Sequence, residues 1–487
     1  MKVDKKTRAK YKLVVGLEVH VQLATQSKIF SADDSAYGSP PNTHISAITL
    51  GHPGTMPKLN KQVVEYAIKM GLACRCAITR HTIFDRKNYF YPDLPKGYQI
   101  MQDKTPICQG GSIPVRTPQG ERDIRLHHIH MEEDAGKSLH TEHESETFVD
   151  LNRAGVALIE IVTDPDIHTS EEAYALLTEI RKIVRYLDIC DGNMEEGSMR
   201  CDANVSVMLR EATELGKKVE IKNMNSIRNV QRAIEYETAR QVTELEQGNP
   251  ILSETRTFDA AQGTTAGMRT KEELNDYRYF PEPDLSPLEV SDAWLANIRA
   301  SMPTLPREYR RKFIEEYGLP DYDAEVLTDT KESAQYFEAL CQHTSHYKAA
   351  SNWMMGPIRS HLNDTSGKID AFPVSPEQIV SLINLVAQNT VSFAVASQRL
   401  FPELVSNPDC SAMQIAEAMN VTQDSNVDSL RPLIEEVLNT FPDKVKAYKQ
   451  GKKGLLGMFM GELMKRSRGK ANPKMANQLM QEALEEV

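Results

Sequence analysis

The stretch HMEEDAGKS, residues 130–138, ends like an ATP-binding P-loop but carries three consecutive acidic residues just before that ending. A P-loop has the pattern GxxxxGK[ST], and its first glycine would fall at position 131, which is Met131. The three carboxylates would also repel phosphate unless a cation lay between them. The sequence therefore favours a metal-binding carboxylate cluster over a phosphate-binding loop.

Other segments place acidic and histidine side chains at alternate positions, as β-strands do. In LVVGLEVHVQL, residues 13–23, every second residue is apolar, so Glu18 and His20 share the opposite face. MRCDANVSV (199–207) and VEIKN (219–223) show the same alternation of apolar and polar residues. Glu, Asp and His are ligand types for Mg²⁺ or Mn²⁺, whereas Lys is commoner on a solvated face. A metal site is one interpretation, and a solvated sheet face, which shows the same alternation, is the other.

The elements that would position these groups change along the chain. The first part alternates apolar and polar residues over short runs, which is typical of strands, and two amphipathic helices are predicted at residues 169–188 and 226–247. After the proline-rich segment 279–288 the strand pattern disappears. SPEQIVSLINLVAQ (375–388) is typical of the short amphipathic helices that follow, and a second shift in composition comes near Asn407.

The length, cysteine content and net charge of the chain exclude several classes of protein. A chain of 487 residues predicts about three domains, and no apolar run is long enough to cross a bilayer. Seven cysteines form no CxxC pair, and Cys74 with Cys76 is too sparse for tetrahedral zinc, so we expect reduced thiols, a cytoplasmic protein and no structural zinc. The net charge of -11 argues against an indiscriminate nucleic-acid binder.

The C-terminal part is a local exception to this acidic average. Between Lys444 and Lys474 there are ten Lys or Arg residues and one acidic residue, Glu462. Such a surplus is either a solvated helix face or a surface for the phosphate backbone of a nucleic acid.

Several uninterrupted motifs carry a resemblance to a known family. VGLEVHVQL, FDRKNYFYPDLPKGYQ, HMEEDAGK, VDLNRAGVALIEIV, GSMRCDANVSV, EIKNMNS and DYRYFPEPD occur in this order. They resemble the motif series of the GatB family, the B subunits of aspartyl/glutamyl-tRNA amidotransferases, and the basic C-terminal stretch resembles the YqeY-like tail of that family. The resemblance implies an α+β fold: a cradle domain around an antiparallel sheet (1–295), an all-helical domain (296–409) and a small helical YqeY-like tail (410–487).

The family's activity is what the resemblance implies for this chain. The cradle would use ATP and Mg²⁺, with Mn²⁺ as an alternative, to phosphorylate the side-chain carboxylate of misacylated Glu-tRNA(Gln) or Asp-tRNA(Asn). Ammonia released by the family's glutaminase, its A subunit, would then form the amide. A small C subunit would complete a heterotrimer, GatCAB, that does not involve a membrane.

The resemblance also implies roles for individual residues. A metal would be bound by Glu18, His20 and Glu133, with Asp202 and Glu220 as further ligands. Catalytic roles would fall to Lys87, Lys96, Glu132 and Lys222, and contacts to the nucleotide would fall to Arg256 and Arg269. Contacts to tRNA would come from Lys452, Lys453, Lys465, Arg466, Arg468 and Lys470.

Two other functions remain open on the sequence. An independent metal-dependent phosphoester hydrolase could use the same acidic face, but it would have no need of a basic tail. A noncatalytic tRNA-binding scaffold would need the basic tail but not the acidic face.

Overall fold

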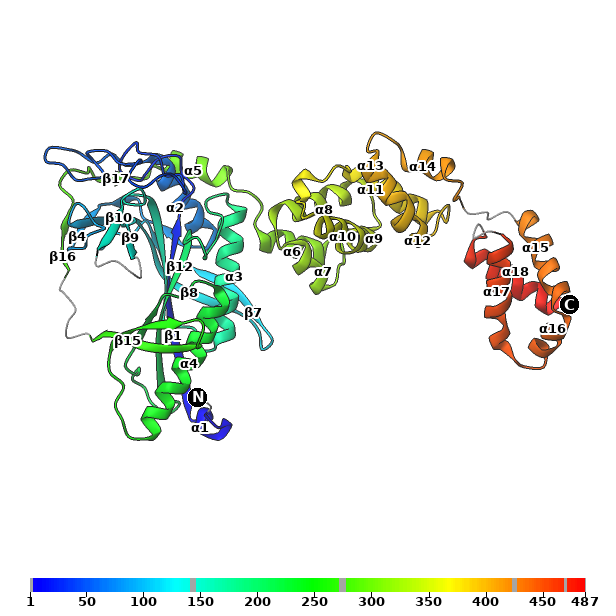
Figure 1. The fold of residues 1–487 in the computed structure, drawn as a ribbon, viewed down its shortest axis with the longest axis horizontal. Coiled ribbons are helices and arrows are strands. Elements are labelled where there is room, and N and C mark those ends of the chain that lie inside the picture. The colour runs from blue at the N-terminus through cyan, green and yellow to red at the C-terminus, as the bar shows by residue number, and fades with distance from the viewer. Residues whose placement is uncertain (1–2, 141–145, 271–276, 423–426, 468–470, 487) are drawn as a thin grey trace. The chain divides into compact units, whose positions relative to one another are not determined.

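The computed structural model describes residues 3–140, 146–270, 277–422, 427–467 and 471–486 (Figure 1). The chain divides into two compact units, Met1–Leu305 and Pro306–Val487. The first unit holds the strands and the second is helical, as the sequence predicts. The further division of the second unit at residue 409 stays a prediction, although residues 430–484 have a hydrophobic core of their own.

A mixed sheet forms the centre of the first unit, and thirteen strands belong to it within the described residues. All of its strand pairs are antiparallel except the parallel pair β13–β14. Its main path runs in spatial order through β15 (Thr264–Thr270), β14 (Glu254–Asp259), β13 (Val219–Lys222), β12 (Met199–Leu209), β1 (Tyr11–Gln22), β11 (Ala157–Thr163), β8 (Gly120–Glu133), β5 (Tyr98–Met101), β4 (Asp85–Asn88) and β16 (Arg278–Pro281).

Shorter strands complete the sheet and two small ladders. Beside β8 lie β6 (Cys108–Gln109), which also pairs with β2 (Ala77–Ile78), and β7 (Ser112–Thr117). Separate pairs are formed by β9 (Lys137–His140) with β10 (Thr147–Asp150) and by β3 (His81–Thr82) with β17 (Leu288–Glu289). The Gly-Lys-Ser stretch thus leads into strand β9, whereas a P-loop leads into a helix.

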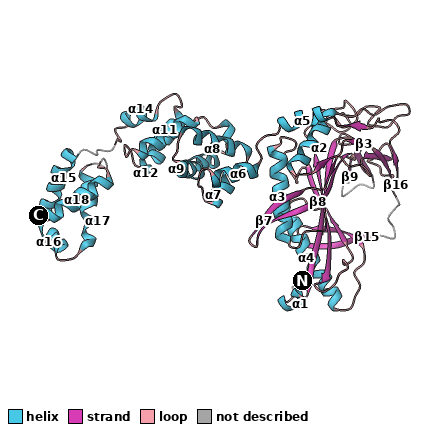
Figure 2. Cartoon of the chain, turned by 180° about the vertical axis from the view of Figure 1, so that it is seen from behind, coloured by secondary structure: helices cyan, strands magenta, loops and turns pink. Residues whose placement is uncertain are grey.

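One face of the sheet is covered by helices α2 (Lys61–Ala73), α3 (Ser170–Tyr186) and α4 (Ile227–Glu246), which lie on the same side of the long strands in Figures 1 and 2. The alternating side chains of β1 that point to this side, from Leu13 to Val21, are buried in the core. The predicted helices 169–188 and 226–247 are confirmed as α3 and α4, capped by the side chains of Thr169 and Ser226. The unit also contains α1 (Lys5–Ala9) and α5 (Asp292–Ala300).

The second unit is built from helices. The predicted helix at residues 375–388 is confirmed as α11 (Pro376–Ala387), which begins with a capping box between Ser375 and Gln378. Among the described residues, no helix combines the length and apolar character needed to cross a membrane. The α-helices before α11 are α6 (Pro306–Glu315), α7 (Asp321–Leu327), α8 (Lys331–His343), α9 (Tyr347–Trp353) and α10 (Arg359–Thr365). Those after it are α12 (Phe393–Val395), α13 (Phe401–Ser406), α14 (Ala412–Ala418), α15 (Val427–Thr440), α16 (Pro442–Lys449), α17 (Leu456–Arg466) and α18 (Pro473–Glu486).

Candidate active site

The strand register brings the acidic side chains together on the sheet face opposite the helices. His20 on β1 pairs with Glu160 on β11, and Glu160 pairs with His130 on β8. On the other side of β1, Glu18 pairs with Asp202 on β12. Residues directly opposite one another on neighbouring strands point to the same face, so these side chains form two adjacent groups.

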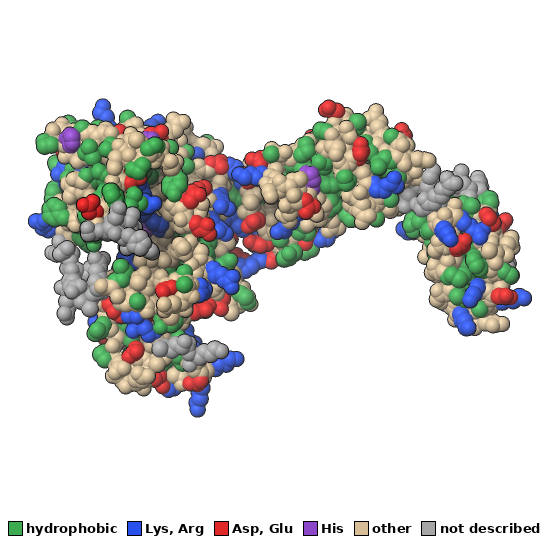
Figure 3. Space-filling model, in the orientation of Figure 1, with side chains coloured by type: hydrophobic (Ala, Val, Ile, Leu, Met, Phe, Trp, Pro, Cys, Tyr) green, Lys and Arg blue, Asp and Glu red, His purple; other side chains and the backbone are tan. Residues whose placement is uncertain are grey.

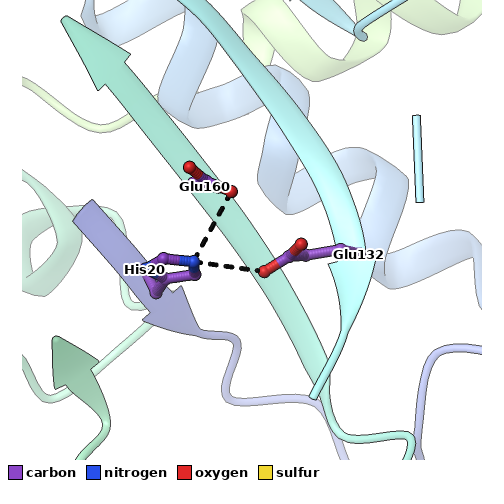
Figure 4. A group of neighbouring side chains, drawn as sticks. All are labelled: His20, Glu132 and Glu160. Carbon is purple, nitrogen blue, oxygen red and sulfur yellow. Dashed lines mark ion pairs between the residues drawn. The ribbon is translucent and has the colours of Figure 1, made fainter. Parts of the chain in front are cut away.

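The first group consists of His20, Glu132 and Glu160 (Figure 4). The Nε2 atom of His20 lies 3.5 Å from Glu132 Oε1 and 3.5 Å from Glu160 Oε2. Burial alone would lower the pKa of His20, but the hydrogen bond and charge of Glu160 and the charge of Glu132 raise it to about 9. A cation is therefore favoured at this position, either a proton on His20 or a metal ion.

The second group consists of Glu18, Asp202 and Glu220, whose nearest ligand atoms all lie within 4.8 Å of one another. Asn204 Nδ2 donates a hydrogen bond of 2.9 Å to Glu18 Oε1. Lys222 Nζ lies 2.5 Å from Asp202 Oδ2 and 2.9 Å from Glu220 Oε1. Burial lowers the pKa of Lys222, but these two carboxylates outweigh it and raise that pKa above its usual range.

The donor atoms of both groups fit a divalent cation. Carboxylates are the protein ligands that Mg²⁺ prefers, and imidazole with carboxylate suits Mn²⁺. Burial and the nearby charge of Glu160 raise the pKa of Glu18, and the charges of Asp202 and Glu220 add to this. Negative charge is thus crowded on this face, and a divalent ion would relieve the repulsion.

Glu133, predicted as a metal ligand, does not join either group. It follows Glu132 on the same strand, so its side chain points the other way. Lys96 Nζ lies 2.5 Å and 2.7 Å from the two carboxylate oxygens of Glu133, and the backbone N–H of Ile100 donates to Oε1 at 2.9 Å. The predicted catalytic Lys96 is therefore the ion-pair partner of Glu133.

Asp134, the third acid of this run, is neutralised by cations. Arg200 Nη2 lies 2.9 Å from its Oδ2 and Arg153 Nε lies 3.7 Å away, while Gln22 Nε2 donates to the same oxygen at 2.8 Å. Burial raises the pKa of Asp134, but these partners hold it below its ordinary value.

Lys87 lies on β4 near the first group. Its Nζ is 5.0 Å from the ring centroid of Tyr277 and 5.8 Å from that of Tyr89. Its charge, after those of His20 and His130, helps to hold the pKa of Glu160 well below its ordinary value although burial acts in the opposite direction. Lys87 is therefore a cation placed beside the acidic face.

The two predicted nucleotide-binding arginines are placed differently. Arg256 on β14 pairs in register with buried Ile221, and it contacts Glu254 at 2.7 Å and Glu237 of α4 at 3.6 Å. It therefore lies on the helix-covered face, away from the acidic groups. Arg269 pairs with Thr255 on β14, and its side chain lies outside the described residues.

The basic residues of the tail have mixed surroundings. Lys452 and Lys465 are exposed, and Lys453 Nζ lies 4.2 Å from the ring centroid of Tyr448. Arg466 is paired with Glu436 at 2.7 Å and Glu462 at 3.3 Å. Arg468 and Lys470 lie outside the described residues. Lys and Arg side chains, blue in Figure 3, are visible on the face of the tail helices that the figure shows.

Sequence reasoning missed Glu160 and His130. Glu160 is the one charged residue of β11, ALIEIVT, in which most side chains are buried. A single acid inside an apolar strand was the available signal, since a buried carboxylate needs a partner. His130 alternates with His128 and Glu132 along β8, which places all three on one face.

The histidines of β8 form a chain of contacts. His127 Nδ1 lies 2.7 Å from His128 Nδ1, and His128 Nε2 lies 3.0 Å from His130 Nδ1. Burial, together with the charges of His130 and His127, lowers the pKa of His128 to about 4. His128 is therefore neutral at physiological pH.

Comparison with known proteins agrees with the motifs. The family described as "GatB/GatE catalytic domain" matches residues 13–296, and that described as "GatB domain" matches residues 335–484. A protein of Thermoanaerobacter pseudethanolicus, named as the B subunit of aspartyl/glutamyl-tRNA(Asn/Gln) amidotransferase, is 47% identical to this chain, over 98% of this chain and 99% of the relative. Proteins of the same name have the same identity in Thermosynechococcus vestitus, over 97% and 96%, and in Alkalilimnicola ehrlichii, over 98% and 99%. The chain belongs to the GatB family of tRNA-dependent amidotransferase subunits.

Proposed function

We propose that this chain is the amidotransferase subunit that activates the side-chain carboxylate of misacylated Glu-tRNA(Gln), Asp-tRNA(Asn) or both, using ATP and a divalent metal ion. The observation that carries the proposal is the meeting of two carboxylate-rich groups on one sheet face, with Lys87 and Lys222 beside them. Such a face suits the handling of a nucleotide through metal ions.

The reaction needs activation because a carboxylate is a poor electrophile. Its negative charge repels the lone pair of ammonia, and oxide is a poor leaving group. In the first step a carboxylate oxygen attacks the γ-phosphorus of ATP, the bond to the β–γ bridging oxygen breaks, and ADP leaves. In the second step ammonia attacks the carbonyl carbon of the acyl phosphate, phosphate leaves with the bonding electrons, and nitrogen loses one proton.

The residues of this sheet face would divide two roles, metal binding and the stabilisation of negative charge. His20, Glu132 and Glu160 would hold one metal ion, and Glu18, Asp202 and Glu220 a second. When bound, such ions neutralise the charge that builds on the transferring phosphoryl group. Lys222 orients Asp202 and Glu220, and Lys87 supplies positive charge next to the first group, where it can steady phosphate or acyl phosphate.

The basic tail residues would hold the tRNA while its acylated end reaches the sheet face. Exposed Lys452 and Lys465 are suited to phosphate contacts, which position an RNA without reading its sequence. Since the relatives are named as B subunits, we infer two partner chains: an A subunit, the glutaminase that supplies ammonia, and a small C subunit.

The test is ATP-dependent conversion of Glu-tRNA(Gln) to Gln-tRNA(Gln), with ammonium as nitrogen donor, by the reconstituted complex and by this chain alone. Asp-tRNA(Asn) is assayed in parallel. Formation of either amide with release of ADP and phosphate supports the proposal. Hydrolysis of phosphate esters by the isolated chain without amidation in the complex would instead identify a hydrolase. Amidation that survives His20→Ala and Glu18→Gln would identify a scaffold.

A further inference from the structure

We propose that the guanidinium of Arg200 binds the γ-phosphoryl group of ATP during its transfer to the substrate carboxylate, so that Arg200 is a further catalytic residue of this face. The inference rests on the proposed function, from which it takes the phosphoryl transfer. It adds a protein group that contacts the transferring phosphoryl group itself, whereas the two acidic groups would act through metal ions.

Arg200 lies next to both acidic groups on the same sheet face. On β12 it is directly opposite His20 of β1, and Asp202, two residues further along β12, is directly opposite Glu18. Side chains that are opposite one another, or two apart on one strand, point to the same face at about 5 to 7 Å from each other. Arg200 therefore adjoins the first group across the strands and the second group along its own strand.

The guanidinium of Arg200 is oriented by Asp134. Its Nη2 atom donates a hydrogen bond of 2.9 Å to Asp134 Oδ2, and the same oxygen accepts one from Gln22 Nε2 at 2.8 Å. The backbone N–H of Ala135 donates to the other oxygen, Oδ1, at 2.9 Å. A buried carboxylate with this many donors is fixed in position, so the arginine bound to it is oriented before any substrate arrives.

Most hydrogen-bond donors of this guanidinium are available to a ligand. Arginine has five N–H groups, and within the described residues the guanidinium of Arg200 makes one hydrogen bond, the one to Asp134. The Arg200 side chain is 33% exposed, whereas that of Asp134 is 5% exposed. Free donors on a partly exposed cation are suited to the binding of an anionic ligand.

Three other cations near this face are already bound to protein groups. Lys222 contacts two carboxylates of the second group, and Lys96 contacts both oxygens of one carboxylate. Arg153 donates from Nε and Nη2 to two backbone carbonyl oxygens. Lys87 carries a point charge, whereas the guanidinium of Arg200 has parallel N–H groups that match two oxygens of a phosphate.

The surroundings keep Arg200 positively charged. Burial lowers its pKa, but the charge of Asp134 and the hydrogen bond to it outweigh this and raise the pKa, and the charges of Glu132 and Asp202 add to the effect. Glu132 belongs to the first group and Asp202 to the second. The guanidinium is thus electrostatically coupled to both groups, and a phosphoryl group bound near them would meet its permanent positive charge.

Phosphoryl transfer develops the negative charge that such a residue stabilises. As a carboxylate oxygen of the substrate bonds to the γ-phosphorus and the bond to the β–γ bridging oxygen breaks, charge is spread over the three equatorial oxygens. An arginine that contacts these oxygens in the transition state accelerates phosphoryl transfer by about 1,000- to 100,000-fold in enzymes that use one. Loss of a contact made mainly in the transition state lowers the rate constant of transfer and leaves the binding of ATP little changed.

A single turnover without glutamine or ammonium isolates this step. The reconstituted complex is given ATP, Mg²⁺ and the misacylated tRNA that the wild type amidates, and ADP is measured after rapid quenching. Arg200→Lys keeps the charge but loses the planar guanidinium, so we expect ADP to form about 1,000-fold more slowly, with nucleotide and tRNA affinities within a few-fold of wild type. Arg228→Lys, which changes an exposed arginine of the covering helix α4, is the matched control and should retain the full rate.

A second measurement uses the wild-type complex and does not depend on the folding of a variant. Phenylglyoxal modifies arginine side chains, and mass spectrometry follows the reaction at Arg200. We expect this modification to be slower with an ATP analogue that has an imido group between the β- and γ-phosphates than with ADP, because ADP lacks the γ-phosphoryl group. The modification of Arg228 should be the same with either nucleotide.

Two results would overturn the inference. One is ADP formation at the wild-type rate in Arg200→Lys, and the other is equal modification of Arg200 with the two nucleotides at equal occupancy, measured by equilibrium dialysis. The proposed function is judged by the wild-type complex alone. Amidation by the wild type with either of these two results would leave the function and remove the inference, whereas a wild type that forms neither ADP nor amide would remove the function itself.

Discussion

The ion pair between Lys96 and Glu133 gives the sharpest prediction about stability. Both side chains are buried: 10% of the Lys96 side chain and 3% of the Glu133 side chain are exposed. Lys96→Met keeps the length and apolar stem of the lysine but removes its charge. Glu133 would then be a buried carboxylate whose remaining hydrogen bond comes from the backbone N–H of Ile100.

The expected cost follows from this geometry. Removing one partner of a buried ion pair typically lowers the free energy of unfolding by about 3–5 kcal/mol, because the other charge stays buried. At about 2.1 cal/mol/K per residue, the 305 residues of the first unit have an unfolding entropy of about 0.6 kcal/mol/K. The midpoint temperature of that unit should therefore fall by about 5 to 8 °C.

Calorimetry of the single variants and of the double variant Lys96→Met/Glu133→Gln measures this coupling. We expect the double variant to regain most of the loss, because glutamine still accepts the Ile100 hydrogen bond without leaving a charge. Glu133→Gln should leave the affinity for Mn²⁺ unchanged, since Glu133 belongs to neither metal-binding group. A loss below about 1 kcal/mol in Lys96→Met, or a double variant no more stable than the single one, would refute the ion-pair reasoning.

Three further predictions concern the second group, a buried lysine and the tail. Glu18→Gln should lower the rate of amidation by at least about 100-fold at fixed Mg²⁺ while tRNA affinity in a filter-binding assay stays within a few-fold, because it removes a carboxylate ligand but no tRNA contact. Lys28 is fully buried, its Nζ donates to the carbonyl oxygen of His44 at 2.6 Å, and burial lowers its pKa to about 8. Between pH 8 and its ordinary value of 10.5 the unfolded chain binds more protons at Lys28 than the folded chain, so wild-type stability relative to Lys28→Met should rise by about 3 kcal/mol over that interval in denaturant titrations. Lys452→Glu and Lys465→Glu should each weaken binding to all tRNAs alike and reduce the slope of log affinity against log salt by about 1, and an unchanged slope would argue against phosphate contacts.

Period-two alternation allowed much of the sheet face to be predicted from the sequence. It assigned Glu18 and His20 to one face of a strand, and Asp202 and Glu220 to the matching faces of two others. The structure brings three of these four into one group. The order of strands could not be derived in this way, because alternation describes each strand alone and says nothing about its neighbours. Glu160 was missed for this reason: its importance comes from lying between β1 and β8.

The predicted roles of Glu133 and Arg256 did not take the local strand geometry into account. Glu132 and Glu133 are consecutive on β8, so one strand cannot present both side chains to the same face, and only Glu132 reaches the metal-binding group. No strand was predicted at residues 120–133, and the strand found there decides which carboxylate reaches the group. At Arg256 the register with β15 shifts, and its side chain lies against Glu237 of α4. Sequence spacing does not reveal such a shift.

Lys222 affects how a metal ion would bind to the second group, Glu18, Asp202 and Glu220. Three carboxylates and one ammonium leave a net charge of minus two, which a single divalent ion would cancel. The ammonium of Lys222 contacts an oxygen of Asp202 and one of Glu220, so a free magnesium ion that entered alone would have to displace it from those oxygens. A magnesium ion that arrives already bound to triphosphate brings anionic oxygens that Lys222 can contact in exchange, and the lysine would favour loading of the nucleotide and its ion together.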